Sequence, residues 1–550
     1  MNPNHTSAVP GLPDTSAVPG PPGTSAVPGP PGTSAVAGPP GSSAVAGPPG
    51  ASAVVSPPGT SAESGPPGAT AVPGPLGTLA VAGRPGVTAV SALPGAAAVS
   101  APPGITAVSE PPATTAVSAP PSTSAVSALP GTSAVSAAPG TSAVSAPPGT
   151  SAVSGPPAAQ QQPDWPDPGA LRAVADELTL LPALVAAEEC NRLREQLAAV
   201  ARGEALLLQG GDCAESLAEA GPDTTAAKYR TLNLMAAVIS EAAGLPVIRL
   251  GRIAGQYAKP RSSPTEIRDG VELPSYRGDM VNGPVFTTAA RTPDPDRLRR
   301  VYHASAKTLG HLRELTAADG GEFWTSHEAL VLEYEHALSR TTPAGRYALS
   351  GHLLWIGERT RRPDGAHIAF AASVRNPIAV KLGPSSTPDD ALRLIDLLDP
   401  DREPGRLTFI SRMGAGAVRD TLPDLVSKVT ASGAEVAWIC DPVHGNTVSS
   451  PTGHKTRRLD DVLNEIEGFL EVHRSLGTHP GGVHLELTGD HVTECVGGTY
   501  EIRFEDLPTR YETVCDPRLN LGQSLDVAFE LAAMYAASPV TDRGTTWATA

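Results

Sequence analysis

The chain has 550 residues, five cysteines and a formal net charge of −16. It contains no block rich in lysine and arginine, which argues against a nucleic-acid-binding surface. It also shows no apolar run of membrane-spanning length, no leader with a basic start and an apolar centre, and no regular cysteine spacing. We therefore expect a cytoplasmic protein with neither a membrane nor a nucleic acid as partner.

Residues 1–160 differ in composition from the rest of the chain. They contain no Phe, Trp, Tyr, Lys or Cys, and Thr-Ser-Ala-Val segments recur between clusters of proline and glycine. Alanine and valine side chains are too small to offset the entropy lost on ordering such a chain. The composition predicts a disordered low-complexity arm, which is either a spacer or docking segment or a sequence without a selected role.

Two helices are predicted after the arm, within residues 161–204. Apolar residues recur at steps of three and four from Leu171 to Leu181, and again from Leu184 to Val200, with Pro182 between the two runs. We expect these helices to lie against a catalytic domain that spans residues 205–550.

Eight short apolar segments follow, and each ends in polar residues. The predicted strands are 205–209, 245–250, 353–356, 378–383, 407–414, 436–439, 482–487 and 511–517. Helical patterns separate most of them, including 326–335 and 459–476. Eight strands alternating with helices predict an α/β fold, the (β/α)8 TIM barrel.

Four residues at or just after the ends of the first and the last three predicted strands form a candidate metal site. These residues are Cys213, His444, Glu486 and Asp516. They can converge because the first and last strands of a closed barrel are neighbours. A thiolate, an imidazole and two carboxylates suit Mn, Co, Fe or Zn better than Ca or Mg. His484 competes with Glu486, because residues two apart on a strand share a face, and spacing alone does not choose between them.

Cationic side chains cluster in or just after the second to fifth predicted strands. They are Arg252, Lys259, Arg261, Arg359, Lys381 and Arg412. Such a set at a barrel mouth would bind phosphates and carboxylates. Arg361 and Arg362 can instead be explained as solvated surface residues. Lys381 and Arg412 closely follow apolar strand residues, and a charge buried there without a partner costs several kcal/mol.

Longer motifs at these positions resemble a known family. They span residues 209–215, 252–262, 355–360, 380–384, 440–447 and 515–520. Over residues 165–537 the chain resembles type II 3-deoxy-D-arabino-heptulosonate 7-phosphate (DAHP) synthases. These (β/α)8 barrels use a divalent metal, commonly Mn²⁺ or Co²⁺, to condense phosphoenolpyruvate with erythrose 4-phosphate, the first step of the shikimate pathway to the aromatic amino acids.

The resemblance implies a role for each candidate residue. Cys213, His444, Glu486 and Asp516 would bind the metal, which favours Glu486 over His484, with Zn²⁺, Fe²⁺ or Cd²⁺ as alternatives to Mn²⁺ and Co²⁺. Phosphoenolpyruvate would contact Arg252, Glu358, Arg359, Lys381 and Arg412, and erythrose 4-phosphate would contact Lys259, Arg261 and Ser262. His444, Glu358 and Lys381 would be catalytic, with Glu358 positioning a water or Lys381 relaying a proton.

The resemblance also implies a homo-oligomer, most simply a dimer. The short interval 291–325 and the repeats at the N-terminus match the compact form associated with secondary metabolism, for which we expect weak inhibition by aromatic amino acids. Two alternatives remain from the sequence. One is a catalytically silent barrel whose Pro-rich arm recruits a partner, and the other is a metal-dependent phosphoenolpyruvate aldolase that uses a different aldose phosphate.

Overall fold

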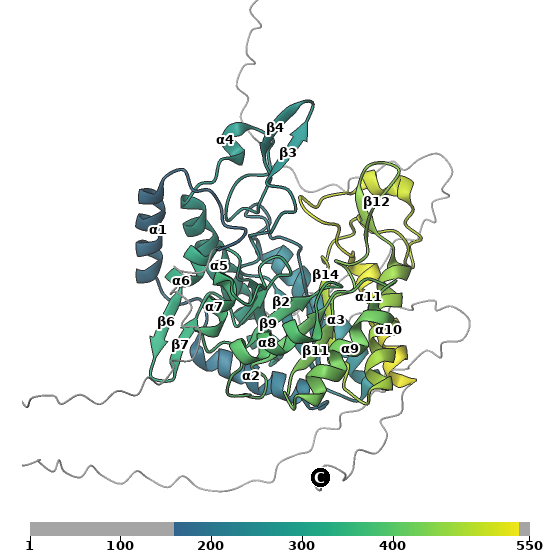
Figure 1. The fold of residues 1–550 in the computed structure, drawn as a ribbon. Coiled ribbons are helices and arrows are strands. Elements are labelled where there is room, and N and C mark those ends of the chain that lie inside the picture. Colours follow the sequence, from purple (N-terminus) through teal and green to yellow (C-terminus); the bar gives the residue numbers. More distant parts are fainter. Residues whose placement is uncertain (1–158, 538–550) are drawn as a thin grey trace, which may run out of the picture. The chain divides into compact units, whose positions relative to one another are not determined.

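The computed structural model describes residues 159–537, so the predicted arm lies outside the described residues except for positions 159 and 160 (Figure 1). Both predicted N-terminal helices are confirmed, as α1 (Pro168–Leu180) and α2 (Ala187–Ala201). The Asp167 side chain caps α1 by accepting hydrogen bonds from the backbone N–H groups of Gly169 and Ala170. That 161–204 forms a part separate from 205–550 stays a prediction.

A closed barrel of parallel strands confirms the predicted fold class. The order around the barrel is β1 (Leu206–Gly211), β14 (Gly482–Glu486), β11 (Ala437–Cys440), β10 (Leu407–Ser411), β9 (Ile378–Leu382), β8 (Leu353–Ile356), β5 (Trp324–Glu328) and β2 (Val247–Arg252). β1 closes the barrel because it pairs with β14 on one side and β2 on the other.

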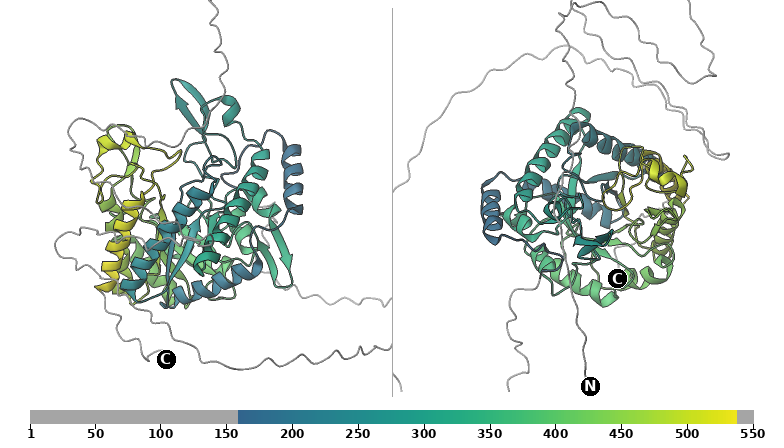
Figure 2. Two further views of the ribbon diagram at one scale, coloured as in Figure 1. Left: turned by 180° about the vertical axis from the view of Figure 1, so that it is seen from behind. Right: turned by 90° about the horizontal axis from the view of Figure 1, so that it is seen from above.

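Helices surround the barrel, as the view from above shows (Figure 2). They are α3 (Pro222–Ala243), α5 (Asp296–Asp319), α6 (Leu332–Ala337), α7 (Ala366–Ala372), α8 (Pro388–Leu398), α9 (Val418–Ala431), α10 (Leu459–Ser475) and α11 (Leu521–Ala536). Short elements decorate the connections. They are α4 (Thr288–Arg291), a 3₁₀ helix (Phe504–Thr509) and the hairpins β3 (Thr265–Arg268) with β4 (Val271–Pro274), β6 (Ser339–Thr342) with β7 (Gly345–Ala348), and β12 (Thr447–Ser449) with β13 (Lys455–Arg457).

Alternation along the strands divides the core into an inner and an outer layer. On β1, Leu206 and Leu208 face the surrounding helices, whereas Leu207 belongs to a separate cluster inside the barrel. Helix α2 lies beneath the barrel in Figure 1 and adds Leu193 and Leu197 to that inner cluster. The base of the barrel is therefore closed by apolar side chains, and a polar site can form only at the opposite end, the rim.

One predicted helix is partly wrong. The sequence pattern of 326–335 predicted a continuous helix, but Trp324–Glu328 is strand β5, and the helix that follows, α6, covers only Leu332–Ala337. β5 pairs in parallel with β2 and β8, so its backbone hydrogen bonds complete the barrel. Such tertiary pairing overrides a local helical pattern. Because β5 is the third barrel strand along the chain, each later predicted strand is numbered one higher than expected. Glu486 therefore ends the eighth barrel strand, not the seventh.

The predicted strand 511–517 is also wrong. This segment is a loop, and the place beside β1 is taken by β14. Its backbone is held by a side chain instead of a neighbouring strand, because the carboxylate of Glu494 accepts hydrogen bonds from the N–H groups of Glu512, Thr513 and Arg518 at 3.2, 2.8 and 2.7 Å. Asp516 thus reaches the rim from a loop.

No helix among residues 159–537 is both long enough and apolar enough to cross a membrane. All five cysteines are free thiols, as expected from their irregular spacing.

Candidate active site at the barrel rim

The site is the uppermost layer of the barrel interior. On β2, Leu250 belongs to the inner core, and Arg252, two residues later, lines a cavity at the rim. The same step on β9 leads from Ala379 in the core to Lys381 in the cavity. Because side chains two apart on a strand share a face, one inward-facing row supplies first the core and then the site.

Every residue that the sequence analysis assigned to a metal or a substrate lines this one cavity, whose volume is about 260 Å³. These residues are Cys213, Arg252, Lys259, Arg261, Ser262, Glu358, Arg359, Lys381, Arg412, His444, Glu486 and Asp516. They come from seven barrel strands and the loops that follow them. The structure places them together, and their individual roles stay predictions.

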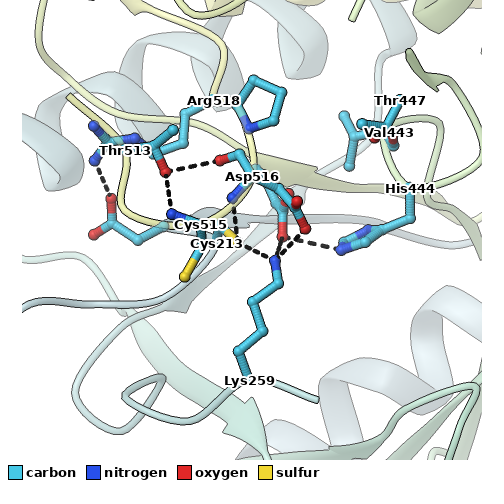
Figure 3. Close-up of polar contacts among 12 residues, drawn as sticks. Cys213, Lys259, Val443, His444, Thr447, Thr513, Cys515, Asp516 and Arg518 are labelled. Atoms are coloured by element: carbon cyan, nitrogen blue, oxygen red, sulfur yellow. Dashed lines mark hydrogen bonds and ion pairs between the residues drawn. The ribbon is translucent and has the colours of Figure 1, made fainter. Parts of the chain in front are cut away.

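Three of the four predicted metal ligands form a compact cluster. One ligand atom each from Cys213, Glu486 and Asp516 lies within 4.8 Å of the other two. Nε2 of His444 lies 3.0 Å from Oε1 of Glu486, at the edge of this cluster (Figure 3). A sulfur, an imidazole nitrogen and carboxylate oxygens therefore face one point, the donor set that suits a divalent transition metal.

Lysine and arginine side chains surround this cluster of candidate metal ligands. The Lys259 ammonium contacts Sγ of Cys213 and Oδ2 of Asp516 and lies 4.0 Å from Oε1 of Glu486 (Figure 3). Lys455 lies 2.9 Å from Asp516, and Arg457 lies 2.7 Å from Glu486. Burial opposes the charge of Asp516, but the neighbouring cations, led by Lys259, hold its pKa well below its usual range. Despite burial, the pKa of Glu486 is likewise held low by its cationic neighbours, and ionised carboxylates that attract positive charge are what a metal site requires.

Asp441 orients the predicted histidine ligand. Its carboxylate lies 2.8 Å from Nδ1 of His444, and the backbone N–H of His444 also donates to it at 3.2 Å. Nε2 is thereby turned toward Glu486. Metal-binding histidines commonly have such a partner on their second nitrogen, because it fixes the orientation of the ring.

His484, the alternative to Glu486, faces the same side of β14 but lies deeper. Its Nδ1 is 2.7 Å from Oε1 of Gln209, and its Nε2 contacts the Arg252 guanidinium. Since a guanidinium only donates, Nε2 accepts and Nδ1 carries the proton given to Gln209. Burial and the nearby charges of Lys381 and Arg252 hold the pKa of His484 well below its ordinary value. His484 thus supports Arg252 and is absent from the cavity lining.

Arg252 is held rigidly at the centre of the rim. Its guanidinium lies 3.0 Å from the carboxylate of Glu486 and donates to the backbone carbonyl of Asp212 at 3.0 and 3.1 Å. It also stacks 4.9 Å from the ring centre of Trp355. The cation therefore joins the candidate metal cluster to the rest of the cavity.

The other cations of the cavity are less fully paired. Lys381 lies 2.7 Å from Asp441, and burial lowers its pKa against the pull of that carboxylate. Arg412 donates to the backbone carbonyl of His444 at 3.2 Å. Arg359 is exposed and forms no ion pair within residues 159–537. This side of the cavity carries positive charge that an anionic ligand can balance.

Sequence reasoning missed Glu328, which ends β5 and lines the cavity. Its Oε1 is buried without a hydrogen-bond partner, and a side chain on Gly357 would collide with that oxygen. Burial raises the pKa of Glu328, although Lys381 and Arg252 act in the opposite direction. Only two apolar residues, Phe323 and Trp324, precede the polar residues 325–328, so the strand-end rule gave no signal here, and the helical pattern of 326–335 concealed the strand.

Other cavity residues were also not assigned from the sequence, among them Gln256, Trp355 and Lys455. Gln256 connects neighbouring strand ends, because its side-chain oxygen accepts the backbone N–H of Glu328 at 2.8 Å. Lys455 comes from the β13 end of a hairpin and pairs with Asp516. Gln256 lies on the loop after β2 but is uncharged, so the search for cations and metal donors did not select it, and Lys455 lies in a hairpin rather than at the end of a barrel strand.

Comparison with known proteins points to one family. The family model described as the class-II DAHP synthetase family matches residues 154–322 and 317–532. A Streptomyces coelicolor protein named phospho-2-dehydro-3-deoxyheptonate aldolase is 56% identical over 430 residues, covering 68% of this chain and 95% of its own length. Phospho-2-dehydro-3-deoxyheptonate aldolase AroG of Mycolicibacterium smegmatis is 45% identical over 432 residues, covering 68% and 92%.

Among solved structures, the phospho-2-dehydro-3-deoxyheptonate aldolase of Francisella tularensis SCHU S4 is only a distant match, with a TM-score of 0.41 and 14% identity over 66% of this chain and 96% of that chain. That likeness adds nothing to the assignment, which rests on the family model and on the two relatives whose lengths the chain covers almost fully. The chain belongs to the class-II DAHP synthetase family.

Proposed function

We infer that this enzyme condenses phosphoenolpyruvate with D-erythrose 4-phosphate and water, giving 3-deoxy-D-arabino-heptulosonate 7-phosphate and inorganic phosphate. This reaction is the first step of the shikimate pathway. The observation that carries the inference is the single rim cavity, in which a cluster of metal-type donor atoms adjoins a row of arginine and lysine side chains.

The cationic row is our proposed phosphoenolpyruvate site. Arg359 and Arg412 offer guanidinium groups that bind phosphate or carboxylate oxygens in pairs, and Lys381 adds a point charge. Arg252 and Glu358 complete the set, with Arg252 lying between this site and the metal cluster. Fixing a highly charged enol phosphate here would turn the meeting of two anionic substrates into an intramolecular event.

Cys213, His444, Glu486 and Asp516 are the proposed ligands of a divalent metal. The mixed sulfur, nitrogen and oxygen donors favour Mn²⁺ or Co²⁺, with Zn²⁺, Fe²⁺ or Cd²⁺ as alternatives. When bound, such an ion supplies a Lewis acid for the aldehyde oxygen of the second substrate. Lys259, Arg457 and Arg252 temper the charge of the carboxylates in the same cluster.

Lys259, Arg261 and Ser262 are proposed to bind the phosphate of erythrose 4-phosphate. They lie on the loop after β2, which joins the metal cluster to the outer edge of the cavity. With both substrates in place, C3 of phosphoenolpyruvate forms a bond to the aldehyde carbon. Water adds at C2, and the C2–O bond to the phosphate breaks to release inorganic phosphate.

The proton of the added water needs an acceptor. Glu358 and Lys381 remain the two groups proposed from the sequence, and both line the cavity. Glu328 is a third, because it is a buried carboxyl group with one unpartnered oxygen at the same rim. Replacing each by an uncharged group of similar size and measuring kcat would identify the acceptor as the position whose loss lowers kcat without weakening substrate binding.

The activity can be tested by following phosphoenolpyruvate consumption and phosphate release on the full-length protein with Mn²⁺ or Co²⁺. Erythrose 4-phosphate is compared with ribose 5-phosphate and glyceraldehyde 3-phosphate. We expect stoichiometric release of phosphate with erythrose 4-phosphate and a much lower kcat/KM with the other two. A preference for another aldose would favour the alternative aldolase, and no turnover with any aldose would favour the silent scaffold.

Two further predictions accompany this function. A homodimer is expected, and light scattering of the purified protein would check it. Weak inhibition by Phe, Tyr and Trp is expected from the resemblance to the compact form of the family, and the same phosphate-release assay would measure it.

A further inference from the structure

A short segment between the repeat arm and α1 lies against the rim of the barrel. This glutamine segment, Gln160–Pro163, connects two rim loops that are far apart in sequence. One loop follows β2 and carries the proposed erythrose 4-phosphate ligands, and the other joins β5 to α6. Nothing in the mechanism above uses this segment.

Gln161 holds the first loop. Its side-chain oxygen accepts a hydrogen bond from the backbone N–H of Arg261 at 2.9 Å and another from Nη2 of Arg277 at 3.2 Å. Arg277 also donates to the backbone carbonyls of Gln161 and Gln162 at 2.9 and 3.3 Å. The backbone carbonyl of Arg277 in turn accepts the N–H of Lys259 at 2.9 Å. Gln161 and Arg277 thus fix the backbone at both ends of the Lys259–Arg261 stretch.

Gln162 anchors the segment to the second loop. Its side-chain nitrogen donates to the backbone carbonyl of Leu330 at 2.7 Å, and its side-chain oxygen accepts the backbone N–H of Leu332 at 3.1 Å. The same nitrogen lies 3.2 Å from Nε2 of His367 on α7. Both polar atoms of the Gln162 side-chain amide therefore form hydrogen bonds to the barrel, and these bonds fix the position of the neighbouring Gln161.

The backbone conformation of Gln161 also indicates that its position is fixed by surrounding contacts. Its φ is +59°, in the left-handed region that residues with a side chain rarely adopt. Such a conformation persists only where surrounding contacts enforce it. Here it turns the side chain of Gln161 toward Arg261 while the side chain of Gln162 points to Leu330.

We propose that Gln161, together with Arg277, is a positioning residue for the erythrose 4-phosphate loop. It holds Lys259 and Arg261 where they can meet the substrate phosphate, and it contacts neither the proposed phosphoenolpyruvate site nor the metal cluster. This proposal rests on the proposed function, which assigns Lys259, Arg261 and Ser262 to erythrose 4-phosphate. It predicts that loss of Gln161 weakens the binding of erythrose 4-phosphate and leaves the binding of phosphoenolpyruvate unchanged.

The test uses Gln161→Leu in the full-length protein, which removes the acceptor of two hydrogen bonds at similar size. We expect the KM for erythrose 4-phosphate to rise about tenfold, the effect of one to two lost hydrogen bonds, while the KM for phosphoenolpyruvate and kcat stay within about twofold. Gln161→Glu retains the acceptor oxygen and should restore the KM. Gln160→Leu is the matched control, because the Gln160 side chain forms no hydrogen bond within residues 159–537.

Arg261→Ala distinguishes the positioning role of Gln161 from the assignment of the loop to erythrose 4-phosphate. If it raises the KM for erythrose 4-phosphate and Gln161→Leu does not, the positioning role is wrong while the substrate site stands. If Arg261→Ala also leaves that KM unchanged, the assignment of the loop to erythrose 4-phosphate is itself wrong. An equal rise of both KM values in Gln161→Leu indicates general loosening and overturns the proposal. Should Gln161→Leu not fold, Gln161→Asn, which is too short to reach Arg261, carries the same test.

Discussion

The base and the rim of the barrel use the same inward-facing row of side chains for opposite purposes. At the base, Leu207, Leu250 and Ile439 pack together against α2. Two residues further along the strands, Arg252 and Asp441 occupy equivalent positions. Burial of apolar side chains at the base stabilises the fold, whereas removing charged groups from water at the rim destabilises it.

The rim limits this cost by pairing its charges. Glu486 is met by Arg252, Arg457 and His444 at 3.0, 2.7 and 3.0 Å. Arg359, at the outer edge, has no such partner among residues 159–537. Substitutions at the rim should therefore change binding and turnover, while substitutions near the base should change stability and leave catalysis intact.

The largest effect is expected from His444→Ala. Loss of the imidazole removes one donor from the candidate metal cluster and leaves Asp441 facing Lys381 alone. We expect kcat/KM to fall by at least about a thousandfold, because metal affinity and the placement of the aldehyde are both lost. Turnover is measured at defined metal concentrations, and phosphoenolpyruvate binding is measured by calorimetry without metal.

Wild-type enzyme stripped with a chelator and reloaded with Mn²⁺ is the control, and it should recover its activity. Full turnover of His444→Ala under the same metal control would remove His444 from the ligand set. Loss of phosphoenolpyruvate binding together with turnover would show that the substitution damaged the whole rim.

Arg359→Met should have the next largest effect. This guanidinium is unpaired at the edge of the cavity, so its removal leaves no buried carboxylate without a partner. We expect the KM for phosphoenolpyruvate to rise about 30- to 100-fold, the value of a charge-assisted pair of hydrogen bonds, with little change in kcat. Arg362→Met is the matched control, because Arg362 lies three residues away and pairs with Asp364 on the surface.

The predicted site residues lie together at one rim because strand-end residues obey a simple geometric rule. Cys213, Lys381 and His444 each follow an apolar run, and parallel strands bring such positions to one rim. The same rule failed for the 511–517 segment, where the strand-like pattern belongs to a loop held by the carboxylate of Glu494. Asp516 was still placed correctly at the rim, since that loop follows the strand neighbouring β1.

What the sequence could not supply depends on contacts between distant residues. β5 is a strand because β2 and β8 leave a gap that only it fills, and no local pattern carries that information. Strand spacing alone could not distinguish His484 from Glu486, whereas the register pairs His484 with Gln209 and so places it below Glu486. The role of Gln161 likewise depends on Arg261 and Arg277, about a hundred residues away.

Glu328→Gln tests the rim residue that the sequence analysis missed. We expect kcat to fall about 10- to 30-fold with KM values little changed. Burial raises the pKa of Glu328, so the carboxylate forms only as pH rises through that raised value. If the ionised form accepts a proton, the kcat of the wild type increases with pH across this range, and the variant loses that increase. Glu322→Gln, just before the other end of β5, is the control and should match the wild type.

The smallest effect is expected near the base, at His473 in the last turn of α10. Its ring lies 4.4 Å from that of Phe469 and 6.0 Å from that of Trp438, and its Nδ1 is 2.8 Å from the hydroxyl of Thr478. Burial among these groups lowers the pKa of His473 to about 3. In the unfolded chain the pKa of histidine is about 6.5.

The sign of the effect follows from these two values. Below pH 6.5 the unfolded chain takes up a proton that the folded protein refuses, so stability is lost as pH falls from 6.5 toward 3. Between pH 7.5 and 5.5 the loss attributable to His473 should be about 1 kcal/mol. His473→Asn should reduce the pH dependence of the free energy of unfolding, measured by urea titration, by that amount. His491→Asn, at an exposed position, should leave this pH dependence unchanged. Because His473 lies far from the charged rim, kcat at pH 7.5 should be unchanged in both variants, and a change confined to His473→Asn would show that base and rim are coupled.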